Sequence, residues 1–197
     1  MTHYISDREF TNYVHDYVAL KHIYSRLGWT QAKIDRDLLE QMDLSKGIDY
    51  VFVDEFNDTK YCQERFRESK YSNYNDFTIR YRRDYSRFVE RQESEYSKIE
   101  ADIFVYGITN GEKSVLESNT KFIKFAVIDL DIIFELIESK RIQIDITSKL
   151  SYIDNNVFFA GYNENSDYSS SFIVFDIKEL NNFFNEENVI IIQEGFY

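Results

Sequence analysis

The chain contains no proline and only one cysteine, Cys62, and each scarcity limits what the protein can be. A single cysteine excludes an internal disulfide and is typical of a reducing compartment. No apolar run reaches the roughly 18 residues that a membrane-spanning helix needs, and the N-terminus lacks the pattern of a signal peptide. We therefore expect a cytoplasmic protein with no membrane partner. The lack of proline beside abundant Asn, Ile, Lys and Tyr is typical of an AT-rich genome, such as that of a phage or mobile element, although chance also produces it.

Familiar catalytic and nucleotide-binding motifs are missing as well. The chain has no Walker loop, G-x-G-x-x-G, G-x-S-x-G, H-E-x-x-H or paired C-x-x-C sequence. Their absence removes nucleotide hydrolysis, dinucleotide binding, serine hydrolysis and zinc binding as first hypotheses. No repeat, low-complexity tract or Pro/Gly/Ser linker divides the 197 residues, so we expect a single domain, 1–197, with its own core.

Charge is strongly unbalanced, with 35 acidic and 23 basic residues and a formal net charge of −12. Such a surplus disfavours general adhesion to nucleic acid or to an anionic membrane. Between residues 60 and 91, however, basic side chains alternate with tyrosines, a pattern that suits phosphate contact and base stacking. The alternative is a solvated face of strands on which these side chains pair with acidic neighbours. The basic residues of this stretch include Arg65, Arg67, Lys70, Arg80, Arg82, Arg83, Arg87 and Arg91.

Two runs of β-type residues, 47–53 and 60–67, are joined by a polar turn and predict a hairpin. Successive side chains of a strand point to opposite faces of the sheet. One face of the second run is therefore polar and can carry chemistry. That face holds Gln63, Arg65 and Arg67, and the opposite face holds Glu64 and Phe66.

This hairpin resembles the core of the PD-(D/E)xK nuclease superfamily, in which an Asp opens one strand and Glu/Gln-x-Lys lies on its antiparallel neighbour. The matching residues are Asp49, Gln63 and Arg65, preceded by a Gly-Ile-Asp lead-in and a helical segment. The resemblance implies Mg²⁺ or Mn²⁺ held by Asp49 and Gln63, since hard cations take oxygen ligands. Glu64 replaces Gln63 as ligand if the strand register shifts by one residue. Arg65 stands where the family Lys activates water, and a guanidinium binds phosphate but exchanges protons poorly.

The resemblance also implies roles for residues beyond the hairpin. Superfamily members that lose the strand Lys can take one from the neighbouring helix, and Lys98 is such a candidate. Gln92 and Tyr96 match the Gln-x-x-x-Tyr element of RecB-type exonucleases, although a solvated helix face explains them equally well. The residues expected to contact nucleic acid are Arg67, Arg80, Arg82, Gln92 and Tyr96.

Periodicity predicts an α/β (α+β) fold, a central mixed β-sheet flanked by helices with a restriction-endonuclease-like core. A helix over about 6–27, ended by Gly28, places His15 and His22 near one face without a known ligand pattern. We expect N-terminal helices over 1–43, a nuclease-like core over 44–110 and a C-terminal sheet and helix extension over 111–197. The other expected elements are helices at 31–42, 86–99, 130–139 and 177–184, and strands at 76–82, 102–109, 121–129, 142–145, 157–161, 171–176 and 189–192.

Three functions remain open from sequence. The first is a divalent-metal-dependent nuclease that hydrolyses phosphodiester bonds, with DNA as the first substrate to test. The second is a catalytically silent acidic protein on the same fold, such as a phage inhibitor that imitates DNA phosphates and binds a host protein. The third is a structural domain in which Asp49 and Arg65 form a salt bridge and no site exists.

Overall fold

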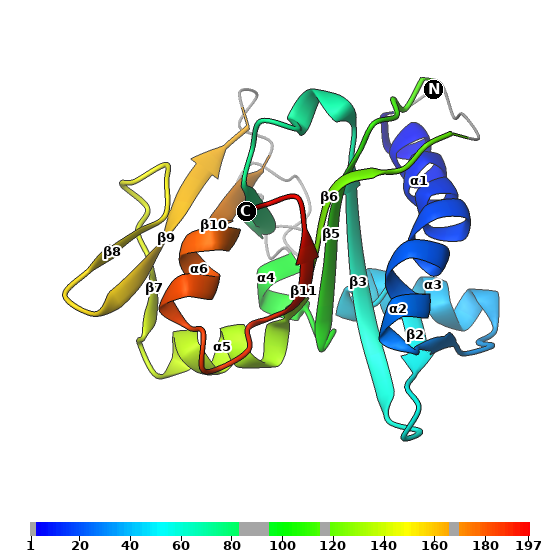
Figure 1. Cartoon of the computed structure of the whole chain (residues 1–197), viewed down its shortest axis with the longest axis horizontal. Coiled ribbons are helices and arrows are strands. Elements are labelled where there is room, and N and C mark those ends of the chain that lie inside the picture. The colour runs from blue at the N-terminus through cyan, green and yellow to red at the C-terminus, as the bar shows by residue number, and fades with distance from the viewer. Residues whose placement is uncertain (1–2, 83–94, 115–118, 166–169) are drawn as a thin grey trace.

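The computed structural model describes residues 3–82, 95–114, 119–165 and 170–197, and Figure 1 shows their arrangement. They form a mixed α+β fold, as predicted, with helices flanking mixed sheets. The strands divide into two sheets, however, where the sequence predicted one. No helix among the described residues is long and apolar enough to cross a membrane.

The first sheet has six strands in the order β1-β2-β3-β5-β6-β11. As predicted, β2 and β3 form an antiparallel hairpin, with Tyr50 opposite Cys62. Strand β5 runs parallel to β3, so the chain must cross over between them. The bounds are β1 (Thr30–Gln31), β2 (Tyr50–Val53), β3 (Thr59–Arg67), β5 (Ile103–Thr109), β6 (Phe122–Asp129) and β11 (Ile190–Glu194).

The second sheet has the order β4-β10-β9-β7, and β8 also pairs with β9. The strand predicted at 76–82 was expected to continue the hairpin as a third strand, but this is wrong, because β4 pairs with β10. There Phe77 stacks on Phe175 at a ring-centroid distance of 4.8 Å, and both side chains are fully buried. The bounds are β4 (Asp76–Arg82), β7 (Ile142–Ile144), β8 (Tyr152–Asp154), β9 (Val157–Glu164) and β10 (Ser171–Asp176).

One continuous helical segment covers the outer face of the first sheet, on the right in Figure 1. It consists of α1 (His3–Val14), the π-helix η1 (His15–Tyr24) and α2 (Ser25–Leu27), and Gly28 ends it with a φ of 70°. It therefore matches the helix predicted over 6–27. The helix predicted over 31–42 is displaced: α3 (Arg36–Lys46) begins after Asp35, whose side chain accepts the N–H groups of its first turn. The reason is that Thr30 and Gln31 pair with β2.

The remaining helical elements lie on the side of the second sheet or between the sheets, and α5 and α6 match their predictions. Of the helix predicted over 86–99, residues 95–98 are helical, and residues 86–94 lie outside the described residues. The bounds are η2 (Ser69–Tyr71, a 3₁₀ turn), α4 (Glu95–Lys98), α5 (Leu130–Glu138) and α6 (Ile177–Phe183). The first sheet thus buries one face against the N-terminal helical segment and the other against the second sheet.

Candidate functional site

Strand β3 carries different polar groups on its two faces, as its alternation predicted. Cys62, Glu64 and Phe66 face the N-terminal helical segment. Cys62 and Phe66 belong to the apolar core beneath it. On the opposite face, Arg65 Nη1 donates a hydrogen bond to the Thr78 carbonyl of β4. The structure therefore places Gln63 and Glu64 on opposite sides of the strand.

Asp49 lies directly across the hairpin from Gln63. Its N–H donates to the Cys62 carbonyl at 2.9 Å, and its Oδ2 accepts the Glu64 N–H at 2.8 Å. These bonds join Asp49 to the two residues that flank Gln63, just beyond Tyr50–Cys62, the last pair of the β2–β3 ladder. Pairing with β2 stops there, and no other described strand covers that edge of β3 beyond Cys62.

A pocket with a volume of about 300 Å³ opens beside this part of β3; we call it the β3-edge pocket. Four of its lining residues are basic and come from three parts of the chain: β3, β4 and the segment after β5. Several predicted site residues thus meet in one cavity. The lining consists of Thr11, Gln63, Glu64, Arg65, Phe66, Arg67, Tyr71, Arg80, Phe104 and Lys113.

The second sheet and its neighbours hold the guanidinium groups of Arg65 and Arg67 in place. Arg65 lies over the Phe172 ring, 5.1 Å from its centroid. Arg67 Nη2 donates to Thr78 Oγ1 at 3.2 Å, and its guanidinium lies 4.7 Å from the Tyr71 ring centroid. A planar guanidinium has the fork geometry that suits phosphate oxygens.

Glu68, which follows β3, makes two polar contacts beside the pocket. Its Oε1 accepts the Lys113 N–H at 2.9 Å, and its Oε2 pairs with Lys70 Nζ at 2.6 Å. Burial alone would raise the pKa of Glu68, but these two lysines outweigh it and lower the pKa below its ordinary value. The carboxylate is therefore ionised at neutral pH and holds the segment that brings Lys113 to the pocket.

Other predicted residues lie outside this pocket. Lys98 Nζ donates to the Leu44 carbonyl at 2.6 Å, so it binds the last turn of α3. Tyr96 packs edge to face on Tyr81 and Phe134, and Arg82 is exposed with its guanidinium over the Tyr81 ring. Gln92 lies outside the described residues.

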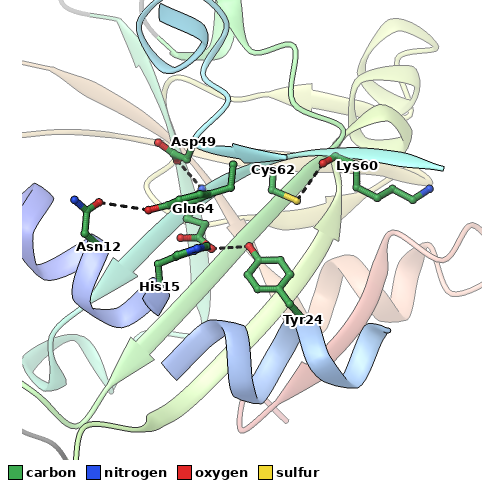
Figure 2. A network of polar contacts seen from close by, with 8 residues as sticks. Asn12, His15, Tyr24, Asp49, Lys60, Cys62 and Glu64 are labelled. Atoms are coloured by element: carbon green, nitrogen blue, oxygen red, sulfur yellow. Dashed lines mark hydrogen bonds and ion pairs between the residues drawn. The ribbon is translucent and has the colours of Figure 1, made fainter. Parts of the chain in front are cut away.

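On the other face of β3, Glu64 is the centre of a buried polar network, shown in Figure 2. Its Oε1 lies 2.8 Å from His15 Nδ1 and accepts the Tyr24 hydroxyl at 2.6 Å. The side chains of Glu64 and His15 have no exposed surface. The Tyr50 ring stacks on the imidazole at a centroid distance of 3.5 Å. This network was not predicted from the sequence. Its one signal was Glu64, a polar residue on the apolar face of a strand, because a buried polar side chain needs a hydrogen-bond partner.

Protonation of this network follows from its geometry. Burial alone would lower the pKa of His15, but the charge of Glu64 and their hydrogen bond outweigh it and raise the pKa above 6.5. Burial, and then the charge of Glu64, raise the pKa of Tyr24 well above 10, so its hydroxyl stays a donor. The raised pKa of His15 shifts its equilibrium toward the imidazolium, and the Tyr24 hydroxyl donates to Glu64 Oε1 beside it.

Stability should depend on pH through His15. A pKa raised in the folded state contributes stability that is fully present below the unfolded-state value of 6.5. That contribution is lost as pH rises through the higher folded-state pKa. We expect the stability advantage of wild type over His15→Gln to shrink across this window, as measured by urea unfolding of both proteins from about pH 6 to about pH 9. An advantage that stays constant with pH would contradict this prediction.

The donor atoms available to a cation are few. Among the described residues, no group of three or more His, Cys, Asp or Glu side chains is placed to hold a metal ion. The expectation that His15 and His22 share a helix face is wrong, because the π-helix buries His15 and leaves His22 exposed. Glu64 is committed to its buried network, on the face away from Gln63.

Asp49 and Gln63 remain as the candidate oxygen donors for a cation. Gln63 Oε1 is buried and accepts no hydrogen bond from the described residues. Mg²⁺ is commonly held by one or two carboxylates, while water and substrate phosphate complete its shell. Asp49, just before β2, and Gln63 on β3 offer one carboxylate and one amide oxygen.

Comparison with protein families, with curated proteins and with solved structures finds no match for the chain. The geometry is therefore what bears on function. Two adjoining features carry the argument: the β3-edge pocket, and the pair of oxygen donors formed by Asp49 and Gln63.

Proposed function

We propose that the protein binds a nucleic-acid phosphate in the β3-edge pocket and hydrolyses the phosphodiester bond with a divalent cation held by Asp49 and Gln63. The observation that supports it is the concentration of four basic side chains in one pocket of a chain whose formal net charge is −12. Phosphate binding depends on such local positive charge. DNA is the first substrate to test.

Gln63 connects the two halves of the proposed site, because it lies opposite Asp49 and also lines the pocket. The cation, when bound, would polarise the phosphate and lower the pKa of an attacking water. Asp49 is held in position by the Glu64 N–H. Arg65 keeps its charge at all relevant pH values, so its role is to orient the phosphate rather than to accept a proton.

We expect metal-dependent cleavage of labelled oligonucleotides that is abolished by EDTA and falls by about 100-fold or more in Asp49→Asn, in the range seen when one electrostatic group of a site is lost. Asparagine keeps an oxygen for the Glu64 N–H, so the variant removes charge while preserving the strand contact. The assay compares single- and double-stranded DNA and RNA in Mg²⁺ and in Mn²⁺. The control is Asp154→Asn on exposed β8, which should cleave like wild type. Cleavage that survives Asp49→Asn, or a folded protein that cleaves nothing, would refute the proposal.

One observation favours a second candidate, a catalytically silent acidic protein that binds a host protein. Arg65 stands where the resemblance requires a Lys, and its Nη1 is engaged with the Thr78 carbonyl. A charged guanidinium cannot take a proton from water. If folded wild type cleaves no substrate but inhibits a host nucleic-acid enzyme, the second candidate replaces the first.

A further inference from the structure

The N-terminal helical segment contains an uncommon feature, a π-helix of ten residues, η1. Most π-helical structure occurs as single-turn bulges inside α-helices, often at functional sites. At the end of η1 the Ser25 N–H donates to the Leu20 carbonyl, five residues earlier, as the π register requires. A π-helix of this length needs interactions that stabilise it over the α form.

The π register determines which side chains share a face. Hydrogen bonds from i to i+5 give about 4.4 residues per turn, so the nine steps along the helix from His15 to Tyr24 span about two turns. In an α-helix of 3.6 residues per turn, the same nine steps span about two and a half turns, and the two side chains would point in opposite directions. Glu64 can therefore contact both His15 and Tyr24 only while η1 is π-helical.

The sequence also supports the competing α register. In an uninterrupted α-helix, Phe10, Val14 and Tyr17 share one apolar face, the pattern from which a helix is predicted over 6–27. That register would bury Tyr17 and turn His15 away from the sheet. In the structure, Tyr17 is instead 67% exposed and His15 is fully buried. An interaction outside the helix must decide between the two registers.

We propose that Glu64 is a positioning residue that selects the π register of η1 and, through it, sets the helical wall of the β3-edge pocket. Thr11, four residues before His15, lines that pocket. Asn12 Oδ1 accepts the hydroxyl of Tyr50, whose ring stacks on His15. The N–H of Glu64 meanwhile holds Asp49. The choice of register is independent of the proposed function, whereas its effect on phosphate binding rests on that function.

Two substitutions separate the effect of the acceptor oxygen on Glu64 from the effect of the volume of its side chain. Glu64→Gln keeps an oxygen for His15 and Tyr24, whereas Glu64→Met keeps side-chain length without one. Hydroxyl-radical footprinting reports the register through Tyr17, with Tyr74, which is 56% exposed, as a reference in the same molecule. We expect Tyr17 oxidation relative to Tyr74 to fall several-fold in Glu64→Met and to match wild type in Glu64→Gln. Equal Tyr17 oxidation in wild type and folded Glu64→Met would overturn the proposal.

Tyr24→Phe tests the proposal if Glu64→Met does not fold. It removes one of the two hydrogen bonds that require the π register. Faster amide hydrogen exchange across residues 15–24 and lower Tyr17 oxidation are expected, because the α register becomes populated. Unchanged values for both measurements would overturn the proposal.

Titration calorimetry with inorganic phosphate then tests the link to the pocket. Binding should be weaker in Glu64→Met than in Glu64→Gln, because only the former moves the wall that carries Thr11. If wild type binds no phosphate, the proposed function fails while the footprinting result still decides the register. If Glu64→Met shifts the register but binds phosphate as wild type does, the link between helix and pocket is wrong.

Discussion

Replacing His15 with alanine is expected to lower the free energy of unfolding by about 3–5 kcal/mol, because Glu64 would remain buried without its cationic partner. Both side chains are fully buried, and the Tyr24 hydroxyl would be the one remaining donor to Glu64 described on this face. Loss of the imidazole also leaves a void against Tyr50, whose ring lies 3.5 Å from it, centroid to centroid. Urea unfolding followed by circular dichroism measures the loss.

His22→Ala provides the matched control for this prediction. It removes the same side chain from the same π-helix, but at an exposed position. Its effect should stay within about 0.5 kcal/mol, as for most surface substitutions. If the two variants lose equal stability, the contact between His15 and Glu64 contributes nothing, and the buried network has no structural role.

The period of two in β3 was sufficient to predict its faces. Charged Arg65 and Arg67 alternate with Glu64 and Phe66, and any sheet buried on the side of Phe66 gives this assignment. The hairpin and the helices α5 and α6 were predictable for the same reason, since their signals lie within a few consecutive residues. Such local patterns determine element type and orientation well.

Pairing between distant strands was not predictable from these patterns. Phe77 and Ile79 alternate with polar residues in β4, which fits either sheet equally well. What assigns β4 to the second sheet is its contact with β10, a strand about a hundred residues later in the chain. The β3-edge pocket shares this limitation, because Arg80 and Lys113 reach it only through the arrangement of both sheets.

The π-helix shows a different limit. The apolar residues before Tyr17 fit an α-helix, and the residue that stabilises the other register, Glu64, belongs to a strand. Sequence periodicity therefore predicted the extent of the helical segment but not the register that buries His15 and exposes Tyr17. A buried carboxylate that requires donors can change the local geometry of a neighbouring element, because leaving it without them is more unfavourable than distorting the helix.

Arg67→Glu is expected to weaken binding of a single-stranded oligonucleotide by about 100-fold, equivalent to about 2.7 kcal/mol. Arg67 lines the pocket, and its guanidinium is fixed between Thr78 and Tyr71. Its buried Nε makes no hydrogen bond within the described residues. A carboxylate at this position would repel a phosphate from the centre of the basic cluster. Fluorescence anisotropy at physiological salt measures the affinity, with EDTA present so that cleavage does not interfere.

Lys178→Glu on α6 is the control, because it changes the net charge by the same amount at an exposed position outside the pocket lining. At physiological salt, charges separated by more than about 8 Å are largely screened, so this control should bind within about twofold of wild type. Arg67→Gln, which removes the charge without reversing it, should show an intermediate loss and guards against misfolding of the glutamate variant. Equal affinities for folded Arg67→Glu and Lys178→Glu would mean that nucleic acid binds elsewhere, and both the pocket and the proposed function would then be wrong.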